Sequence, residues 1–245
     1  MNMSQVYLSV VIPAYNEAKK LPDTLPKMYE YLKKQSYDWE ILIVNDGSKD
    51  NTAQVVKDLS SQIENLRLID NKENNGKGYV VKQGMLSARG KYRLFTDADN
   101  STSIDQVEKM WPEFEKGNDV VIGSRDIEGA KLAVPQPFWR IMIGNVFNLM
   151  VQILTGLWGI PDTQCGFKGF TDKAAKDIFS KTRISRFAFD PEILVIAKKM
   201  GYKIKEVPVY WVNDKRSSVK FKSMVKMAID LFKIRLNMIQ GLYEK

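Results

Sequence analysis

The regular alternation of short apolar runs with helical stretches along the first half of the chain limits the possible folds most strongly. The apolar runs predict strands at Leu8–Ile12, Glu40–Val44, Leu66–Ile69, Tyr92–Thr96 and Val120–Ile122. The intervening stretches predict helices at Leu21–Lys34, Asp50–Ile63, Gly78–Ala88 and Ile104–Lys116, and Asp50 is expected to be an N-cap. Strands that alternate with helices build a mainly parallel, doubly wound α/β sheet, which binds ligands where its strands end.

Composition excludes several classes of protein. A chain of 245 residues is long enough for one α/β domain with a full core. The single cysteine, Cys165, excludes an internal disulfide framework and suits a reducing cytoplasm. The sequence contains no histidine, so any reaction must proceed without the commonest general base and zinc ligand.

The segment 138–156 is apolar apart from Arg140 and one polar stripe. The stripe contains Asn145, Asn148, Gln152 and Thr155. This pattern predicts an interfacial or half-buried helix rather than one that spans a bilayer, and a buried core helix is the alternative.

The C-terminal segment carries most of the positive charge. From Val212 to Lys245 there are eight basic and three acidic residues, which gives +5 of the net +8. Within it, Phe221–Tyr243 predicts an amphipathic helix that either lies on a membrane or packs on its own domain. Arg235 falls inside the apolar arc, where its guanidinium requires an anion from the protein or from a lipid.

These patterns predict a division of the chain and a location. We expect one α/β domain over residues 1–217, which includes the interfacial helix 138–156, and an amphipathic helix over residues 218–245. The apolar run Leu8–Ala14 is too short for a signal peptide and reads as a buried strand. The expected location is peripheral, on the cytoplasmic face of a membrane, without a transmembrane span.

Four polar motifs carry the chemistry of the first hundred residues. Three follow strands, at Pro13–Glu17, Asn45–Ser48 and Thr96–Asp99, and Asn74–Gly78 opens a helix. The last of these presents a lysine and free backbone N–H groups to a diphosphate, but it is neither a Walker loop nor a dinucleotide fingerprint. Asp97 and Asp99 repel each other unless a cation joins them, and Mg²⁺ or Mn²⁺ would bridge them to phosphate oxygens.

In this order the four motifs resemble glycosyltransferase family 2, whose fold is the GT-A (nucleotide-diphosphosugar transferase) fold. Five later blocks are similar to the dolichyl-phosphate β-glucosyltransferase branch. They are Gly123–Arg125, Trp139–Arg140, Asp162–Lys168, Phe187–Glu192 and Glu206–Trp211. The resemblance implies a membrane-associated, inverting enzyme that moves glucose from UDP-glucose to a polyprenyl or dolichyl phosphate. Dolichyl-phosphate mannosyltransferases share the arrangement, so GDP-mannose is the nearest alternative donor.

The resemblance also implies roles for individual residues. The nucleotide-sugar would be bound by Pro13, Tyr15, Glu17, Asp46, Lys77 and Asp97. The metal would be held by Asp97 and Asp99, and the lipid phosphate by Ser124, Arg125, Arg140, Lys220 and Arg235. Asp97, Asp99, Arg125, Arg140 and Asp162 would form the catalytic set. The chain departs from the family pattern at Asn45, where a carboxylate is usual, and at Ser217–Lys220, which replaces Gly-Ser-Lys.

A phosphate acceptor needs no general base, because it is already ionised at neutral pH. This agrees with a chain that lacks histidine. A saccharide or protein hydroxyl acceptor would instead need Asp162, Asp190 or Glu192 as the base. A nucleic-acid-binding module is disfavoured, because the basic residues share a helix with an apolar face and lack interleaved aromatics. A metal-binding pseudoenzyme is a further alternative.

Overall fold

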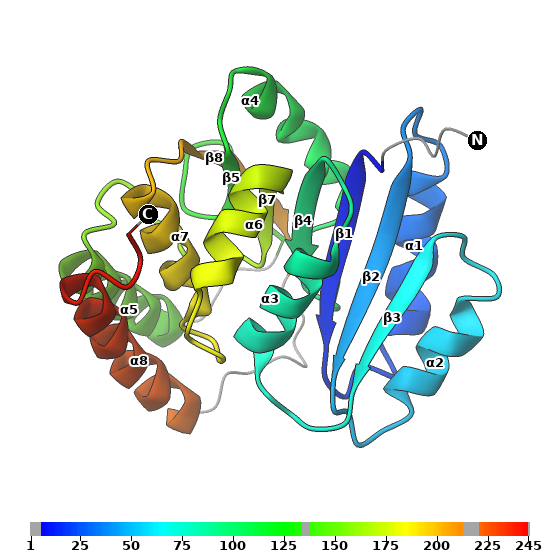
Figure 1. Ribbon diagram of the computed structural model, residues 1–245, viewed down its shortest axis with the longest axis horizontal. Helices are drawn as coiled ribbons and strands as arrows, with labels where there is room; N and C mark the ends of the chain where they lie inside the picture. The colour runs from blue at the N-terminus through cyan, green and yellow to red at the C-terminus, as the bar shows by residue number, and fades with distance from the viewer. Residues whose placement is uncertain (1–5, 134–137, 213–220, 245) are drawn as a thin grey trace.

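A seven-stranded sheet in the order β3-β2-β1-β4-β7-β5-β8 forms the centre of the molecule (Figure 1). The computed structural model describes residues 6–133, 138–212 and 221–244. The strands are β1 (Leu8–Ala14), β2 (Trp39–Asp46), β3 (Leu66–Asn71), β4 (Tyr92–Thr96), β5 (Val120–Ser124), β7 (Phe167–Thr171) and β8 (Ile204–Pro208). Strand β7 runs antiparallel to both neighbours, and the other pairings in this sheet are parallel. The expected mainly parallel sheet is therefore confirmed.

Helices cover both faces of the sheet, because alternate strand residues point to opposite sides. On β1, Val10 and Ile12 pack on one face and Val11 packs on the other. The face of Val10 is covered by α1 (Leu21–Leu32), α2 (Thr52–Leu59), the 3₁₀ helix η1 (Ile104–Lys109) and α4 (Trp111–Glu115). The face of Val11 is covered by α3 (Lys77–Ser87), α6 (Asp172–Lys181) and α7 (Phe189–Lys199).

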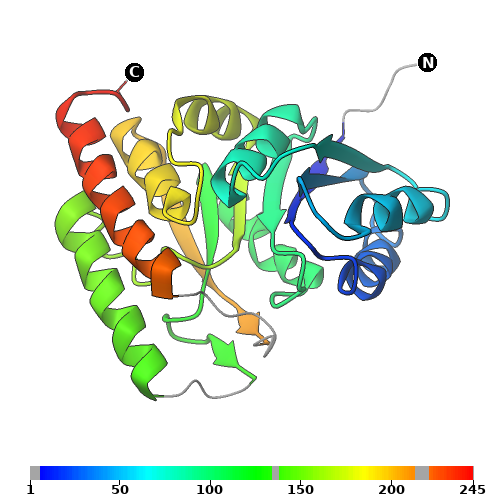
Figure 2. The same ribbon diagram turned by 90° about the horizontal axis from the view of Figure 1, so that it is seen from below.

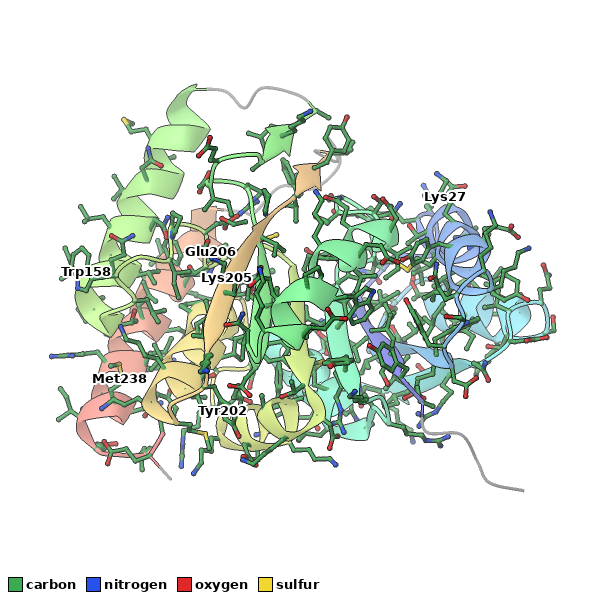
Figure 3. The ribbon with its side chains drawn as sticks, turned by 90° about the horizontal axis from the view of Figure 1, so that it is seen from above. Lys27, Trp158, Tyr202, Lys205, Glu206 and Met238 are labelled. Atoms are coloured by element: carbon green, nitrogen blue, oxygen red, sulfur yellow. The ribbon has the colours of Figure 1, made fainter. Side chains whose placement is uncertain are left out.

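Two long helices, α5 (Phe138–Thr155) and α8 (Phe221–Ile239), lie side by side at one end of the molecule (Figures 1 and 2). Val151, Leu231 and Ile234 bury their inner sides in the same cluster as α3, α6 and α7. Figure 3 shows Trp158, just after α5, and Met238 of α8 at this end, with Lys27 of α1 at the opposite end. A small two-stranded sheet joins β6 (Lys131–Leu132) to β9 (Tyr210–Trp211).

The outer sides of α5 and α8 expose two rows of apolar side chains, spaced three or four residues apart. We call them the apolar stripes: Met142, Val146, Leu149 and Ile153 on α5, and Val225, Ile229, Phe232, Leu236 and Ile239 on α8. Each of these side chains is between 46% and 70% exposed. Helix α5 is thus half-buried, as expected. Among the described helices, none has both the length and the apolar character needed to cross a membrane.

Three expectations differ from the structure. The predicted helix Ile104–Lys116 is divided into η1 and α4, because Pro112 lacks the N–H that would bond to the carbonyl of Glu108. Asp50 is not the N-cap, since Asn51 occupies that position, but its carboxylate accepts a bond from the backbone N–H of Thr52 at 3.0 Å. Strands β6 to β9 and helices α6 and α7 were not predicted. The predicted boundary between residues 217 and 218 lies outside the described residues.

Candidate functional site

A cavity of about 420 Å³ opens where β1, β2 and β4 end, at the carboxyl edge of three adjacent strands. Its lining includes all seven residues that the sequence indicated for the nucleotide-sugar and the metal. They are Pro13, Tyr15, Glu17, Asp46, Lys77, Asp97 and Asp99. Arg186 and Phe187, from the segment before α7, line it as well. Sequence reasoning missed these two, although Phe187 begins one of the blocks that it singled out.

Asp46, the last residue of β2, is fixed by the loop before α3. Its carboxylate accepts bonds from the backbone N–H groups of Asn75 (2.7 Å) and Gly76 (3.0 Å) and from the side-chain amide of Asn74 (2.8 Å). Burial raises the pKa of Asp46, and the backbone bonds oppose that shift. Gly76 has φ of +104°, and a Cβ there would lie 2.3 Å from the carbonyl oxygen of Ser185. Only glycine fits this position.

Lys77 and Asp97 form an ion pair across the floor of the cavity, with Nζ 2.6 Å from Oδ1. Burial lowers the pKa of Lys77, but Asp97, Asp190 and Asp99 more than offset it and raise that pKa above its ordinary value. Lys77 is therefore a cation at neutral pH. Asp99 accepts a bond from the backbone N–H of Ser101 at 3.0 Å.

The residues present are compatible with a hard divalent cation. Asp97 and Asp99 supply carboxylate oxygens in one cavity, and Mg²⁺ is commonly held by one or two carboxylates plus substrate phosphates. Within the described parts of the chain, no group of three or more acidic, histidine or cysteine side chains could hold a metal. A cation at this pair would thus take remaining ligands from water and from the phosphates of the nucleotide.

A buried ion pair and a glycine lie near Asp97. The Nζ of Lys168, on β7, lies 2.6 Å from Oδ1 of Asp190 and donates to the carbonyl oxygen of Cys165 at 2.5 Å. Just before β7, Gly166 packs so closely on Asp97 that a Cβ would lie 2.1 Å from its Oδ2. Lys168 and Asp190 belong to two blocks identified in the sequence, but no sequence pattern indicated that their side chains form an ion pair.

Arg125 and Asp162 form a bidentate pair. Nε lies 2.7 Å from Oδ2 and Nη2 lies 2.8 Å from Oδ1, while the backbone N–H of Arg125 also donates to Oδ2 at 3.0 Å. The guanidinium lies over the Trp211 ring at 5.3 Å. Burial raises the pKa of Asp162, but Arg125 more than offsets it and holds that pKa below its ordinary value. An ionised, paired carboxylate of this kind is a weak general base.

The other described residues predicted for the lipid phosphate come from different elements, Ser124 from β5 and Arg235 from α8. Ser124 is fully buried at the end of β5, which argues against direct contact between its hydroxyl and a lipid. Arg235 is exposed on α8 beside Phe232 and Leu236. Lys220 and the side chain of Arg140 lie outside the described residues. The structure describes the side chains of Ser124, Arg125 and Arg235 only, so this set as a whole stays a prediction.

A carboxyl-edge pocket with an acidic pair, on a sheet of this order, defines the GT-A class of nucleotide-sugar transferases. The model of the family described as glycosyl transferase family 2 matches residues 9–179, and the chain belongs to that family.

Three proteins illustrate the similarity. Dolichyl-phosphate beta-glucosyltransferase ALG5D of Trichomonas vaginalis is 40% identical over 94% of this chain and 73% of its own length. Dolichyl-phosphate beta-glucosyltransferase of Dictyostelium discoideum is 40% identical over 99% of this chain and 78% of its own. Glucosyl-3-phosphoglycerate synthase of Mycobacterium tuberculosis, solved with Mn²⁺, UDP and phosphoglyceric acid, has a TM-score of 0.70 at 15% identity. The similarity to this structure covers 94% of this chain and 78% of that one and supports the fold alone.

Proposed function

We propose that this protein transfers glucose from UDP-glucose to dolichyl phosphate or a similar polyprenyl phosphate, with inversion at the anomeric carbon. One observation carries the proposal. The seven residues implied for the nucleotide-sugar and the metal line a single cavity in a chain that is 40% identical to dolichyl-phosphate β-glucosyltransferases over nearly its full length.

The donor would lie along the carboxyl edge of β1, β2 and β4. Tyr15 and Asp46, which line the cavity, would hold the uridine, and Lys77 opens a helix whose N-terminal N–H groups favour a diphosphate. Asp97 and Asp99 would hold Mg²⁺ or Mn²⁺, which adds positive charge beside the departing UDP. The cationic Lys77 contributes to the same stabilisation from the protein side.

The charge pairing around the cavity favours a phosphate acceptor over a hydroxyl. Three carboxylates were candidates for a general base, and each is already engaged. Asp162 is held by Arg125, Asp190 by Lys168, and Glu192 by the backbone N–H groups of residues 183 and 184. An ionised phosphate oxygen attacks the anomeric carbon without giving up a proton, so none of them has to act.

The apolar stripes would rest on the membrane that contains the acceptor. Large exposed apolar areas on a soluble domain mark interaction surfaces, and exposed Lys226, Lys233 and Arg235 on α8 add charge that anionic headgroups attract. We place this face on the cytoplasmic leaflet, where nucleotide-sugars are available. Peripheral attachment through α5 and α8 does not require a described helix to span the bilayer.

A donor and acceptor screen tests the proposal. Purified protein is incubated with UDP-glucose or GDP-mannose and with dolichyl phosphate, undecaprenyl phosphate or a free saccharide, with and without Mg²⁺. We expect a lipid phosphate-linked glucose that forms only with the divalent cation, and little product from Asp99→Asn. Exposed Asp105→Asn, on η1, serves as the matched control and should retain wild-type turnover. Transfer to the saccharide without lipid product would refute the proposal.

A further inference from the structure

A second cavity, also of about 420 Å³, lies between α8 and the segment that joins α6 to α7. We call it the basic groove. Its charged lining consists of Arg183 and Arg186 from the segment and Lys226, Asp230 and Lys233 from α8. Asp230 pairs with Lys233 at 2.7 Å, and in the described part of the chain no carboxylate forms an ion pair with the other three cations. With four cations and one carboxylate in its lining, the groove has a net charge of +3, which is 4 minus 1.

The segment wall of the groove is held in place by a buried carboxylate. Glu192, on α7, accepts bonds from the backbone N–H groups of Arg183 and Ile184, each at 2.9 Å. The hydroxyl of Tyr243, just after α8, donates to the same carboxylate at 2.6 Å. One side chain thus ties the segment to both α7 and the end of α8. The backbone that carries Arg183 and Arg186 is therefore already ordered, so a ligand would have to order only their side chains.

The groove connects two surfaces already described. Arg186 lines both the groove and the donor cavity. The backbone N–H of Tyr79, on α3, donates to the carbonyl oxygen of Ser185 at 3.2 Å, so the groove wall is joined to the helix that Lys77 begins. On its other side the groove contains Ile229, a member of the α8 apolar stripe that is 52% exposed.

We propose that the basic groove captures the phosphate of the polyprenyl phosphate acceptor, with the lipid tail along the α8 apolar stripe. The inference rests on the proposed function and adds a binding site to it. This surface offers cations without an ion-pair partner and, next to them, exposed apolar side chains. A phosphate joined to a long apolar chain is complementary to both. Arg125, by contrast, has its guanidinium already committed to Asp162.

The connection to the donor cavity favours the acceptor over a bilayer phospholipid. A headgroup that only anchors the protein has no need of a cation that also lines the nucleotide-sugar site. Arg186 is such a cation. Its guanidinium also donates to Oδ1 of Asn74 at 3.3 Å, and Asn74 in turn holds Asp46. A captured phosphate would therefore lie beside the donor before transfer.

The test uses Arg183→Gln/Lys226→Gln, which changes the groove and leaves Arg186 intact. The matched control is Arg89→Gln/Lys203→Gln, which removes the same charge from exposed positions away from the groove. Turnover is measured in neutral detergent micelles with dolichyl phosphate and UDP-glucose. Each exposed charge-assisted bond is worth about three- to fivefold in affinity, so we expect the KM for the lipid to rise about tenfold. The kcat and the KM for UDP-glucose should not change, and the control should match the wild type.

A direct binding measurement separates this inference from the proposed function. Protein is pelleted with phosphatidylcholine vesicles of three kinds. The first contain dolichyl phosphate, the second contain phosphatidylserine, and the third contain neither. Weaker binding of the groove variant to the dolichyl phosphate vesicles alone supports the capture site, even if the wild type transfers no glucose. Wild-type binding and an unchanged lipid KM would overturn the capture site while transfer stands. A loss confined to phosphatidylserine vesicles would assign the groove to bilayer headgroups and would also overturn it.

Discussion

Replacing Gly166 by alanine should disable the site while leaving the fold intact. The new Cβ would lie 2.1 Å from Oδ2 of Asp97, and real Cβ atoms essentially never approach another heavy atom within 3.0 Å. The carboxylate must therefore move by about 0.9 Å or more, which is 3.0 minus 2.1. Asp97 is also paired to Lys77 at 2.6 Å, so the displacement changes that ion pair as well.

The loss of activity should be much larger than the loss of stability. A misplacement of about 1 Å at a reacting site costs roughly 100-fold in rate, and we expect that decrease in kcat/KM for Gly166→Ala. The contact falls on the end of a side chain that can rotate, so unfolding should be affected at the low end of overpacking, about 1 kcal/mol. Gly144→Ala on α5 is the control, since no atom lies within 4 Å of its added Cβ, and it should remain fully active.

A double-mutant cycle identifies the cause. Initial rates of lipid-glucose formation are compared for Gly166→Ala, Asp97→Asn and the combination. If the alanine acts by displacing Asp97, the double variant should be no slower than Asp97→Asn alone. The reasoning is refuted if Gly166→Ala keeps kcat/KM within about threefold of the wild type. It is refuted equally if the two losses multiply.

Three further predictions concern stability and membrane binding. Asp162→Asn should lower the free energy of unfolding by about 2–4 kcal/mol at pH 7, since it leaves a largely buried arginine unpaired. Because the pKa of Asp162 is lowered from 3.8 in the folded state, its contribution to stability is present above pH 3.8 and is lost as the pH falls through the folded-state pKa. The unfolding free energies of the wild type and the variant, measured by urea titration, should therefore converge at low pH. Lys168→Met should cost about 3–5 kcal/mol by urea denaturation, and adding Asp190→Leu should recover part of that loss; equal losses would contradict a paired buried charge. Phe232→Ser should weaken vesicle binding about tenfold, while Leu86→Ser, 39% exposed on α3, should not; equal effects would exclude the apolar stripes as the contact.

The grouping of the candidate donor-site carboxylates could be predicted because these residues end or follow strands. Asp46 and Asp97 end or follow apolar runs, and parallel strands bring their carboxyl ends to one edge, so their proximity follows from chain order. The alternation of strands and helices likewise predicted the mainly parallel sheet from chain order alone. Each of these inferences requires only local patterns and one topological rule.

The buried ion pairs near the site could not be predicted in this way. Strand β7 contains Lys168 and Gly169, which are uncommon in a buried strand, and the lysine is stabilised there by Asp190, 22 positions along the chain. Arg125 reads as a free cation until the fold places Asp162 against it, 37 positions away. These ion pairs depend on tertiary geometry, and no local sequence pattern predicts them.

If the protein rests on a bilayer through α5 and α8, as proposed, their shared core would fix how far the candidate site stands from that bilayer. Leu231 of α8 and Val151 of α5 pack in the same cluster as Val80 of α3, the helix that Lys77 begins. A protein resting on its two outer helices would therefore hold UDP-glucose at one height above the acyl chains. The phosphate of a lipid must then rise to that height, so turnover should vary with bilayer thickness and packing even where acceptor density is constant.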